Sequence, residues 1–138
     1  DISKKAIYIA KYNAKMQHIQ NRIKFVNSNI DKFSLGKYDL IISNPPYIIN
    51  YKINYLDDDV KMYEPKVALD GGVDGYSEIK KVVRKSVELI KTKGKLVIEI
   101  GDKQINFTKE ILRVNGFYIN KIVKDLSKKN RCIVSTKI

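Results

Sequence analysis

The run Asn44-Pro45-Pro46-Tyr47 combines the residue types and spacing with the most specific chemistry in this 138-residue chain. Each proline fixes its own φ angle and keeps the preceding residue out of the helical region, so the run is rigid before any ligand binds. The side-chain oxygen of Asn44 and a proline carbonyl can both accept hydrogen bonds from one planar NH2 group, while the ring of Tyr47 packs on its face. Such a site suits an amide or an exocyclic amine whose nitrogen must be held in one orientation.

The segment that positions this motif is Tyr38–Ser43, whose apolar run predicts a strand buried on both faces. The two prolines end its pairing. In open α/β sheets, ligands bind beyond the carboxyl ends of the strands. The alternative, an ordinary turn at a strand end, is therefore less favoured than a ligand site.

Hydrophobic periodicity predicts helices alternating with strands along the rest of the chain. Ser3 is expected to cap a first helix, Gly94 to stop a second one whose apolar face is Ile79–Ile90, and Gly116 to end a third. Further strands are predicted at Ile23–Val26, Lys95–Ile100, Phe117–Val123 and Cys132–Thr136, and the last two are expected to form an antiparallel hairpin. The connection over residues 48–75 is expected to be irregular, and loops of that length are usually functional. The order predicts an α/β open sheet.

Composition limits the other classes of function. The 27 Lys and Arg residues against 15 Asp and Glu give a net charge of +12, but the lysines are scattered and predict mostly solvated surface. Cys132 is the single cysteine, which excludes an intramolecular disulfide and a cysteine-based zinc site. His18 is expected at the surface and Asp57–Asp59 to be a solvated acidic run, so no metal site is predicted. Apolar runs are shorter than the ~20 residues of a membrane span, and no leader peptide is expected, which indicates a cytoplasmic protein.

Several stretches resemble one protein family. Asp39–Tyr47 resembles the substrate motif of amino-methylating, S-adenosylmethionine-dependent methyltransferases. The resemblance narrows to the HemK/PrmC-type protein-(glutamine N5) methyltransferases through these stretches: Asp1-Ile2-Ser3 with Ala10 and Asn13-Ala14, the loop Glu64–Gly75, Glu99-Ile100-Gly101 with Gln104, and Asp125 with Arg131. It implies a Rossmann-like class I methyltransferase sheet with a C-terminal antiparallel hairpin. Residues 1–138 would then be a partial catalytic domain that lacks the first strand and the Gly-rich cofactor loop.

The resemblance also assigns roles to residues. Asp1 falls where the family binds the ribose hydroxyls of S-adenosylmethionine, and Asn29 with Ile30 falls where it lines the adenine pocket. Asn29 departs from the usual Asp there but keeps an amide oxygen that can accept from the adenine amine. Asn44, Pro45, Pro46 and Tyr47 match the glutamine-binding motif, and Asn44 also belongs to the cofactor site.

The implied substrate is the glutamine of the Gly-Gly-Gln motif in peptide-chain release factors. No nucleic acid or membrane is required, and a monomer is expected at full length. One alternative is an adenine-N6 methyltransferase acting on DNA or RNA, since adenine also presents a planar NH2 group. The other is a non-catalytic module that binds translation components. Glu64 and Asp70 are candidate bases or structural residues of their loop. The 138-residue chain alone is expected to bind cofactor weakly, to be inactive and to expose unpaired strand edges.

Overall fold

The computed structural model describes residues 1–138, which form two compact units, Asp1–Ser34 and Leu35–Ile138. The first unit contains helix α1 (Lys4–Met16) and the 3-10 turns η1 (Gln20–Arg22) and η2 (Ile30–Lys32). Ser3 caps α1 as predicted, because its hydroxyl accepts a hydrogen bond from the Ala6 N–H at 3.2 Å.

The predicted strand at Ile23–Val26 is wrong. Ile23 has extended backbone angles, yet the segment forms no ladder. The residues that follow this segment are hydrogen-bonded to Asp1 and Ile2. The Ser28 N–H donates to the Asp1 carbonyl at 3.0 Å, and the Asn27 side-chain amide donates to the carbonyls of Asp1 and Ile2. A strand needs a partner of several residues, and two are too few to make one.

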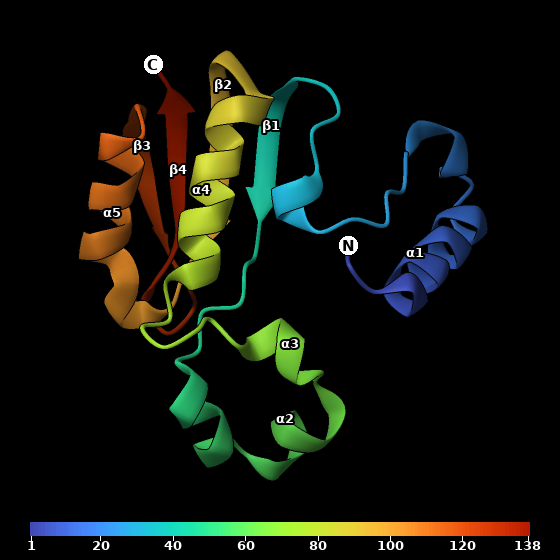
Figure 1. The fold of residues 1–138 in the computed structure, drawn as a ribbon, viewed down its shortest axis with the longest axis horizontal. Coiled ribbons are helices and arrows are strands. Elements are labelled where there is room, and N and C mark those ends of the chain that lie inside the picture. Colours follow the sequence, from blue (N-terminus) through green and yellow to red (C-terminus); the bar gives the residue numbers. More distant parts are fainter. The chain divides into compact units, whose positions relative to one another are not determined.

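The second unit is built on a four-stranded sheet of order β1-β2-β4-β3 (Figure 1). Its strands are β1 (Tyr38–Ser43), β2 (Ile90–Glu99), β3 (Phe117–Lys124) and β4 (Asn130–Lys137). β1 and β2 are parallel, while β4 is antiparallel to both β2 and β3. The α/β sheet and its terminal antiparallel hairpin are therefore confirmed.

Two helices cover one face of this sheet, α4 (Ser77–Leu89) and α5 (Ile105–Val114) (Figure 1). α4 buries the predicted apolar face and makes the crossover between the parallel strands. The core beneath the helices consists of buried residues of α4, the strands and α5, among them Ile79, Val83, Leu96, Ile98, Leu112, Phe117 and Ile133. Gly116, with φ of 78°, follows α5 as predicted.

Burial of β1 on both faces is wrong. Leu40 and Ile42 are 48% and 72% exposed, whereas Ile41 and Ser43 on the other face are partly buried. β1 is an edge strand within this sheet, and α4 packs against only one of its faces. The apolar run therefore predicted the strand correctly but overestimated how much of it is buried.

The predicted helix stop at Gly94 is also wrong, because α4 ends at Leu89 and β2 begins at Ile90. Gly94 instead lies where the β1–β2 register is irregular, and a Cβ atom there would come within 3.1 Å of the Asp39 carbonyl oxygen. The glycine thus allows close approach of two strands.

The connection over residues 48–75 is not irregular, contrary to expectation. It contains η3 (Asn50–Tyr55), α2 (Asp58–Tyr63) and α3 (Lys66–Leu69) (Figure 1). These helices are at most six residues long and bury little, so no apolar periodicity marks them in the sequence.

Candidate active site

The Asn44–Tyr47 motif follows the carboxyl end of β1, as predicted. β2 runs parallel beside β1 and ends at Glu99, so the two carboxyl ends lie at the same edge of the sheet. Pro45 is buried and anchors the motif. The Asn44 side chain is exposed and makes no hydrogen bond within the chain, which leaves its amide oxygen available to a ligand.

The hydroxyl of Tyr47 is held between two side chains of opposite charge. It donates a hydrogen bond to Glu99 Oε1 at 3.3 Å and accepts one from Arg131 Nη1 at 3.5 Å. Burial raises the pKa of Tyr47, and the neighbouring Glu99 carboxylate raises it further. Tyr47 therefore stays neutral at physiological pH and presents a fixed aromatic ring.

Arg131 connects this hydroxyl to the terminal hairpin. Its guanidinium donates to Asp125 Oδ2 from Nη2 at 2.9 Å and from Nε at 3.2 Å, and to the Ile100 carbonyl at 3.3 Å. The backbone N–H of Lys129 and the Arg131 guanidinium hold the pKa of Asp125 below its ordinary value. In the sequence, Asp125 and Arg131 are recognisable only through the family resemblance; the structure brings Arg131 to Tyr47.

The backbone of Tyr47 is in close contact with the glycine-containing end of the 48–75 connection. A Cβ atom on Gly71 would lie 2.8 Å from both Cα and C of Tyr47, and one on Gly75 would lie 2.9 Å from the Tyr47 carbonyl oxygen. Gly75 also has a φ of 76°, which side chains disfavour. These glycines therefore bring the loop that resembles the family directly against the motif.

Backbone bonds fasten the same loop to the residue after the motif. The Ile48 N–H donates to the Leu69 carbonyl at 3.1 Å, and the Gly71 N–H donates to the Ile48 carbonyl at 2.8 Å. Asp70 has both oxygens occupied, one by the Gly72 N–H at 2.9 Å and the other by the Asn50 amide at 2.8 Å. This arrangement supports the structural role of Asp70 over that of a base.

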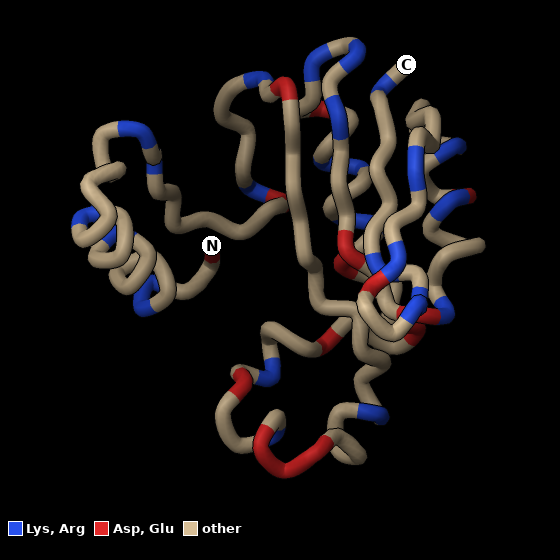
Figure 2. The backbone as a smooth tube through the Cα atoms, turned by 180° about the vertical axis from the view of Figure 1, so that it is seen from behind, with Lys and Arg blue, Asp and Glu red and all other residues tan.

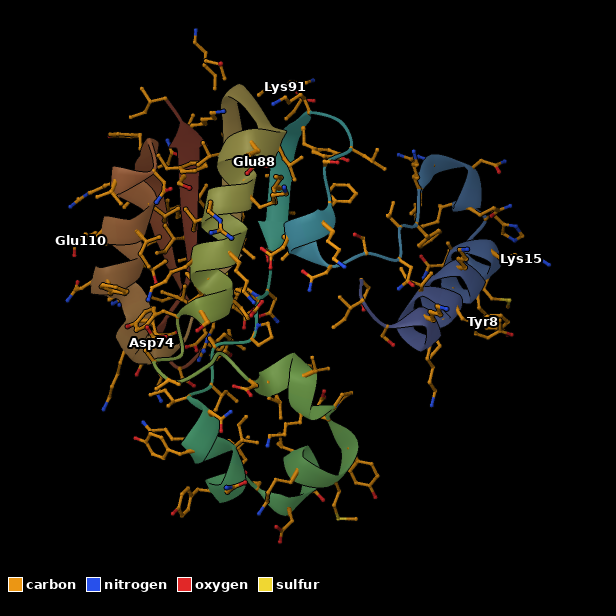
Figure 3. All side chains as sticks on the ribbon, viewed as in Figure 1. Tyr8, Lys15, Asp74, Glu88, Lys91 and Glu110 are labelled. Atoms are coloured by element: carbon orange, nitrogen blue, oxygen red, sulfur yellow. The ribbon has the colours of Figure 1, made fainter.

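The turn that leads from the loop into α4 is ordered by Asp74 (Figure 3). Asp74 Oδ1 accepts from the Tyr76 N–H at 2.8 Å, and Oδ2 pairs with Lys80 Nζ at 2.8 Å. Lys80 and the Tyr76 N–H lower the pKa of Asp74. The Tyr76 ring meets Phe107 of α5 edge to face at 4.7 Å, so this end of the loop packs against α5.

The predicted cofactor residues Asp1, Asn29 and Ile30 lie in the first unit. Asn29 lines an open hollow of about 360 Å³ together with Ile2, Asn27, Ser28 and Lys32. Asp1 Oδ1 accepts from the Ser3 N–H at 2.7 Å, and Asn29 Oδ1 accepts from the Asp31 N–H at 3.0 Å. Both side chains are exposed, and Asp1 Oδ2 and the Asn29 amide nitrogen remain free. The free Asp1 oxygen suits ligand hydroxyls, and the free Asn29 amide nitrogen is a donor that suits a ring nitrogen. The Asn29 oxygen, expected to accept from a ring amine, already accepts from the Asp31 N–H and has one lone pair left for a ligand.

Two residues near the motif had no assigned role in the sequence analysis, Glu99 and Gln104. Gln104 is buried, and its amide nitrogen donates to the Tyr47 carbonyl. The spacing of these residues gave no sign of this contact, because they lie more than 50 positions from Tyr47 in the sequence.

The structure contains no group of three or more His, Cys, Asp or Glu side chains placed to hold a metal ion. None of its helices has the length and apolar character needed to span a membrane.

Comparison with known proteins adds an independent observation. The family described as "Methyltransferase small domain" matches residues 1–56, which include Asp1, Asn29 and the Asn44–Tyr47 motif. The release factor glutamine methyltransferase of Fusobacterium nucleatum is 40% identical over 99% of this chain, and that of Clostridium acetobutylicum is 34% identical over 99%. The chain spans 39% and 49% of the lengths of these two relatives.

Solved structures show the same fold. Magnesium protoporphyrin IX methyltransferase from Synechocystis PCC 6803, solved with bound SAM, superposes with a TM-score of 0.63 over 100% of this chain and 57% of its own, at 18% identity. At that identity the likeness speaks for the fold alone. It agrees with the predicted methyltransferase sheet. The resemblance inferred from the sequence is thus confirmed: over nearly its whole length the chain matches part of the release factor glutamine methyltransferases, and it has a methyltransferase fold.

Proposed function

We propose that the full-length protein transfers a methyl group from S-adenosylmethionine to the side-chain amide nitrogen of the glutamine in the Gly-Gly-Gln motif of peptide-chain release factors. One observation carries this proposal. The Asn44–Tyr47 motif, which suits a planar NH2 group, is fixed by the loop that resembles the glutamine methyltransferases. The names of the relatives support the same substrate.

In this mechanism the motif orients the amide. Asn44 Oδ1 and the Pro45 carbonyl accept the two N–H groups of the glutamine, and the Tyr47 ring packs on the amide plane. When bound, S-adenosylmethionine supplies an electrophilic methyl group on a positively charged sulfur. The residues of the motif contribute mainly by holding the nitrogen in the orientation for in-line attack. A base is not required, because the nitrogen becomes acidic once it carries the methyl group and can lose its proton to water.

The first unit would hold the cofactor. The Asp1 carboxylate suits the two ribose hydroxyls, since a carboxylate accepts two hydrogen bonds at once. Asn29 and Ile30 would line the adenine pocket, with the polar edge of the ring against the Asn29 amide and its face against Ile30. The solved methyltransferase with bound SAM supports the choice of this cofactor.

Methylation of adenine is the second candidate, and the distribution of charge is the observation that bears on it. Figure 2 shows Lys and Arg spread along the chain, and Asp and Glu are likewise distributed, with one acidic run at Asp57–Asp59. A DNA-binding face is marked by basic residues clustered on one element or face, and the 27 Lys and Arg residues here are scattered along the sequence. The glutamine enzyme is therefore the better interpretation. A monomeric state and a cytoplasmic location stay predictions.

Incubating the full-length protein with cofactor labelled in the methyl group tests the proposal. The substrates are a release factor, the same factor with the motif glutamine replaced by alanine, and duplex DNA. We expect label in the first only. Label in adenine would favour the DNA enzyme, and binding of the factor without any label would favour the non-catalytic module.

A further inference from the structure

Gln104 makes a set of hydrogen bonds that the chemistry described so far does not use. It lies at the end of η4 (Asp102–Gln104), and its side chain is 8% exposed. Oε1 accepts from the Gly101 N–H at 2.9 Å, while Nε2 donates to the Gly75 carbonyl at 2.9 Å and to the Tyr47 carbonyl at 3.3 Å. The carboxamide thus has both amide hydrogens and its oxygen engaged.

The two carbonyls that Gln104 binds belong to the motif and to the loop, and no backbone N–H donates to either of them. These two segments already touch, because Gly71 and Gly75 have no side chain to separate them from Tyr47. Backbone bonds join the loop to Ile48 and Asn50, but none of them joins Gly75 to Tyr47. A single amide group that donates to both carbonyls fixes their separation.

We infer that Gln104 is a positioning residue, whose carboxamide locks the Tyr47 backbone to the Gly75 loop and so sets the orientation of the amide-binding motif. This inference rests on the proposed function for its effect on the reaction. Gln104 does not reach the substrate; it acts through Tyr47 and, along the rigid proline pair, on Asn44.

The chemistry of the side chain explains why glutamine is needed here. A glutamate of the same length keeps the acceptor for the Gly101 N–H but, when ionised, has no hydrogen to donate to the two carbonyls. An asparagine has both donors but is one methylene shorter. A leucine fills the space and leaves both carbonyls without a donor.

The test uses the full-length protein with Gln104→Glu and Gln104→Asn, and with Lys103→Ala as the matched control in the same turn. Lys103 is exposed and has no hydrogen bond or ion pair. We expect the single-turnover rate of methyl transfer, measured per cofactor-bound molecule, to fall by about tenfold or more in both Gln104 variants, since small misplacements of reacting groups are costly. The cofactor dissociation constant should stay within about twofold, and Lys103→Ala should match the wild type.

A purely structural role gives a different result. It would lower the fraction of molecules that bind cofactor and leave the rate per cofactor-bound molecule unchanged, and that outcome would overturn the inference. Gln104→Asn keeps the polar character of the site, so the test stands even where Gln104→Glu fails to fold.

Hydrogen–deuterium exchange separates this inference from the proposed function. The amides of Ile48, Asn50 and Gly71 are hydrogen-bonded between the motif side and the loop side. They should exchange faster in Gln104→Glu and Gln104→Asn than in the wild type or Lys103→Ala. Unchanged exchange in these amides would refute the positioning role, whatever the substrate. Faster exchange in the variants of a protein that leaves release factors unmethylated would support the positioning role of Gln104 and refute the proposed methylation of release factors.

Discussion

The candidate residues of the first unit and those of the second are held in different ways. The Tyr47 side chain and carbonyl bind partners that are 52, 57 and 84 positions away in the sequence, whereas the side chains of Asp1 and Asn29 each accept a bond from an N–H two positions away. Ala14 is the one buried apolar residue of the first unit, and the buried core lies in the second. The amide site is thus set by tertiary structure and the cofactor residues by local turns.

This difference predicts how the two sites respond to substitution. Changes at exposed ligand-binding atoms should alter function without altering stability in either unit. Changes among the groups that hold Tyr47 should alter both function and stability, because the same contacts join the motif to β2 and to the hairpin.

The largest effect is expected for Asn44→Ala. The variant loses one of two acceptors that orient the amide, and the rate of methyl transfer should fall by about 10²-fold or more. Its melting temperature should not change, because the side chain is exposed and unbonded. Steady-state kinetics and thermal unfolding of the full-length protein measure both. Asn106→Ala, at an exposed position of α5, is the control. Activity near that of the wild type would show that Asn44 does not orient the substrate.

A smaller effect is expected for Asp1→Asn in the first unit. The amide oxygen can still accept from the Ser3 N–H, so the turn is kept and only the charge is lost. Hydrogen bonds to charged groups contribute about 1.5–3 kcal/mol, so cofactor affinity should fall by about tenfold or more, with kcat at saturating cofactor unchanged. Calorimetric titration measures the affinity, with Asp57→Asn as a control for the loss of one negative charge. Equal affinities for the wild type and Asp1→Asn would remove Asp1 from the ribose site.

The smallest effect concerns Asp125, which is partly exposed to solvent. Its pKa is lower in the folded protein than the ordinary value of about 3.9, so its ionised form stabilises the fold. That contribution is present above about pH 4 and is lost as the pH falls through the folded pKa. The difference in unfolding free energy between wild type and Asp125→Asn should therefore be seen at pH 7 and shrink below pH 4. Urea unfolding at several pH values measures it, and a constant difference would exclude the ionisation of Asp125 as its source.

The sequence was sufficient to predict the elements with a strong period or a clear cap, namely α1 after Ser3, α4 and the hairpin. It was sufficient to place Asn44–Tyr47 at a strand end, because prolines interrupt pairing. It was not sufficient to show that Ile23–Val26 forms no strand, or that one face of β1 is exposed. Both depend on which segments of the chain pack beside these residues. The contacts of Gln104 could not be predicted either, because no local pattern encodes a bond between residues 57 positions apart.

The contact between Gly71 and the Tyr47 backbone has a thermodynamic consequence. At this junction two main chains are in direct contact, with no flexible side chain between them, so their conformational entropy is already lost when the protein folds. Little further conformational entropy of the protein is therefore lost when a substrate amide binds. Binding to a rigid site avoids the ordering cost that a mobile loop would add. We therefore expect a calorimetric binding entropy that changes little between peptide substrates of equal length, with the differences among them residing in enthalpy.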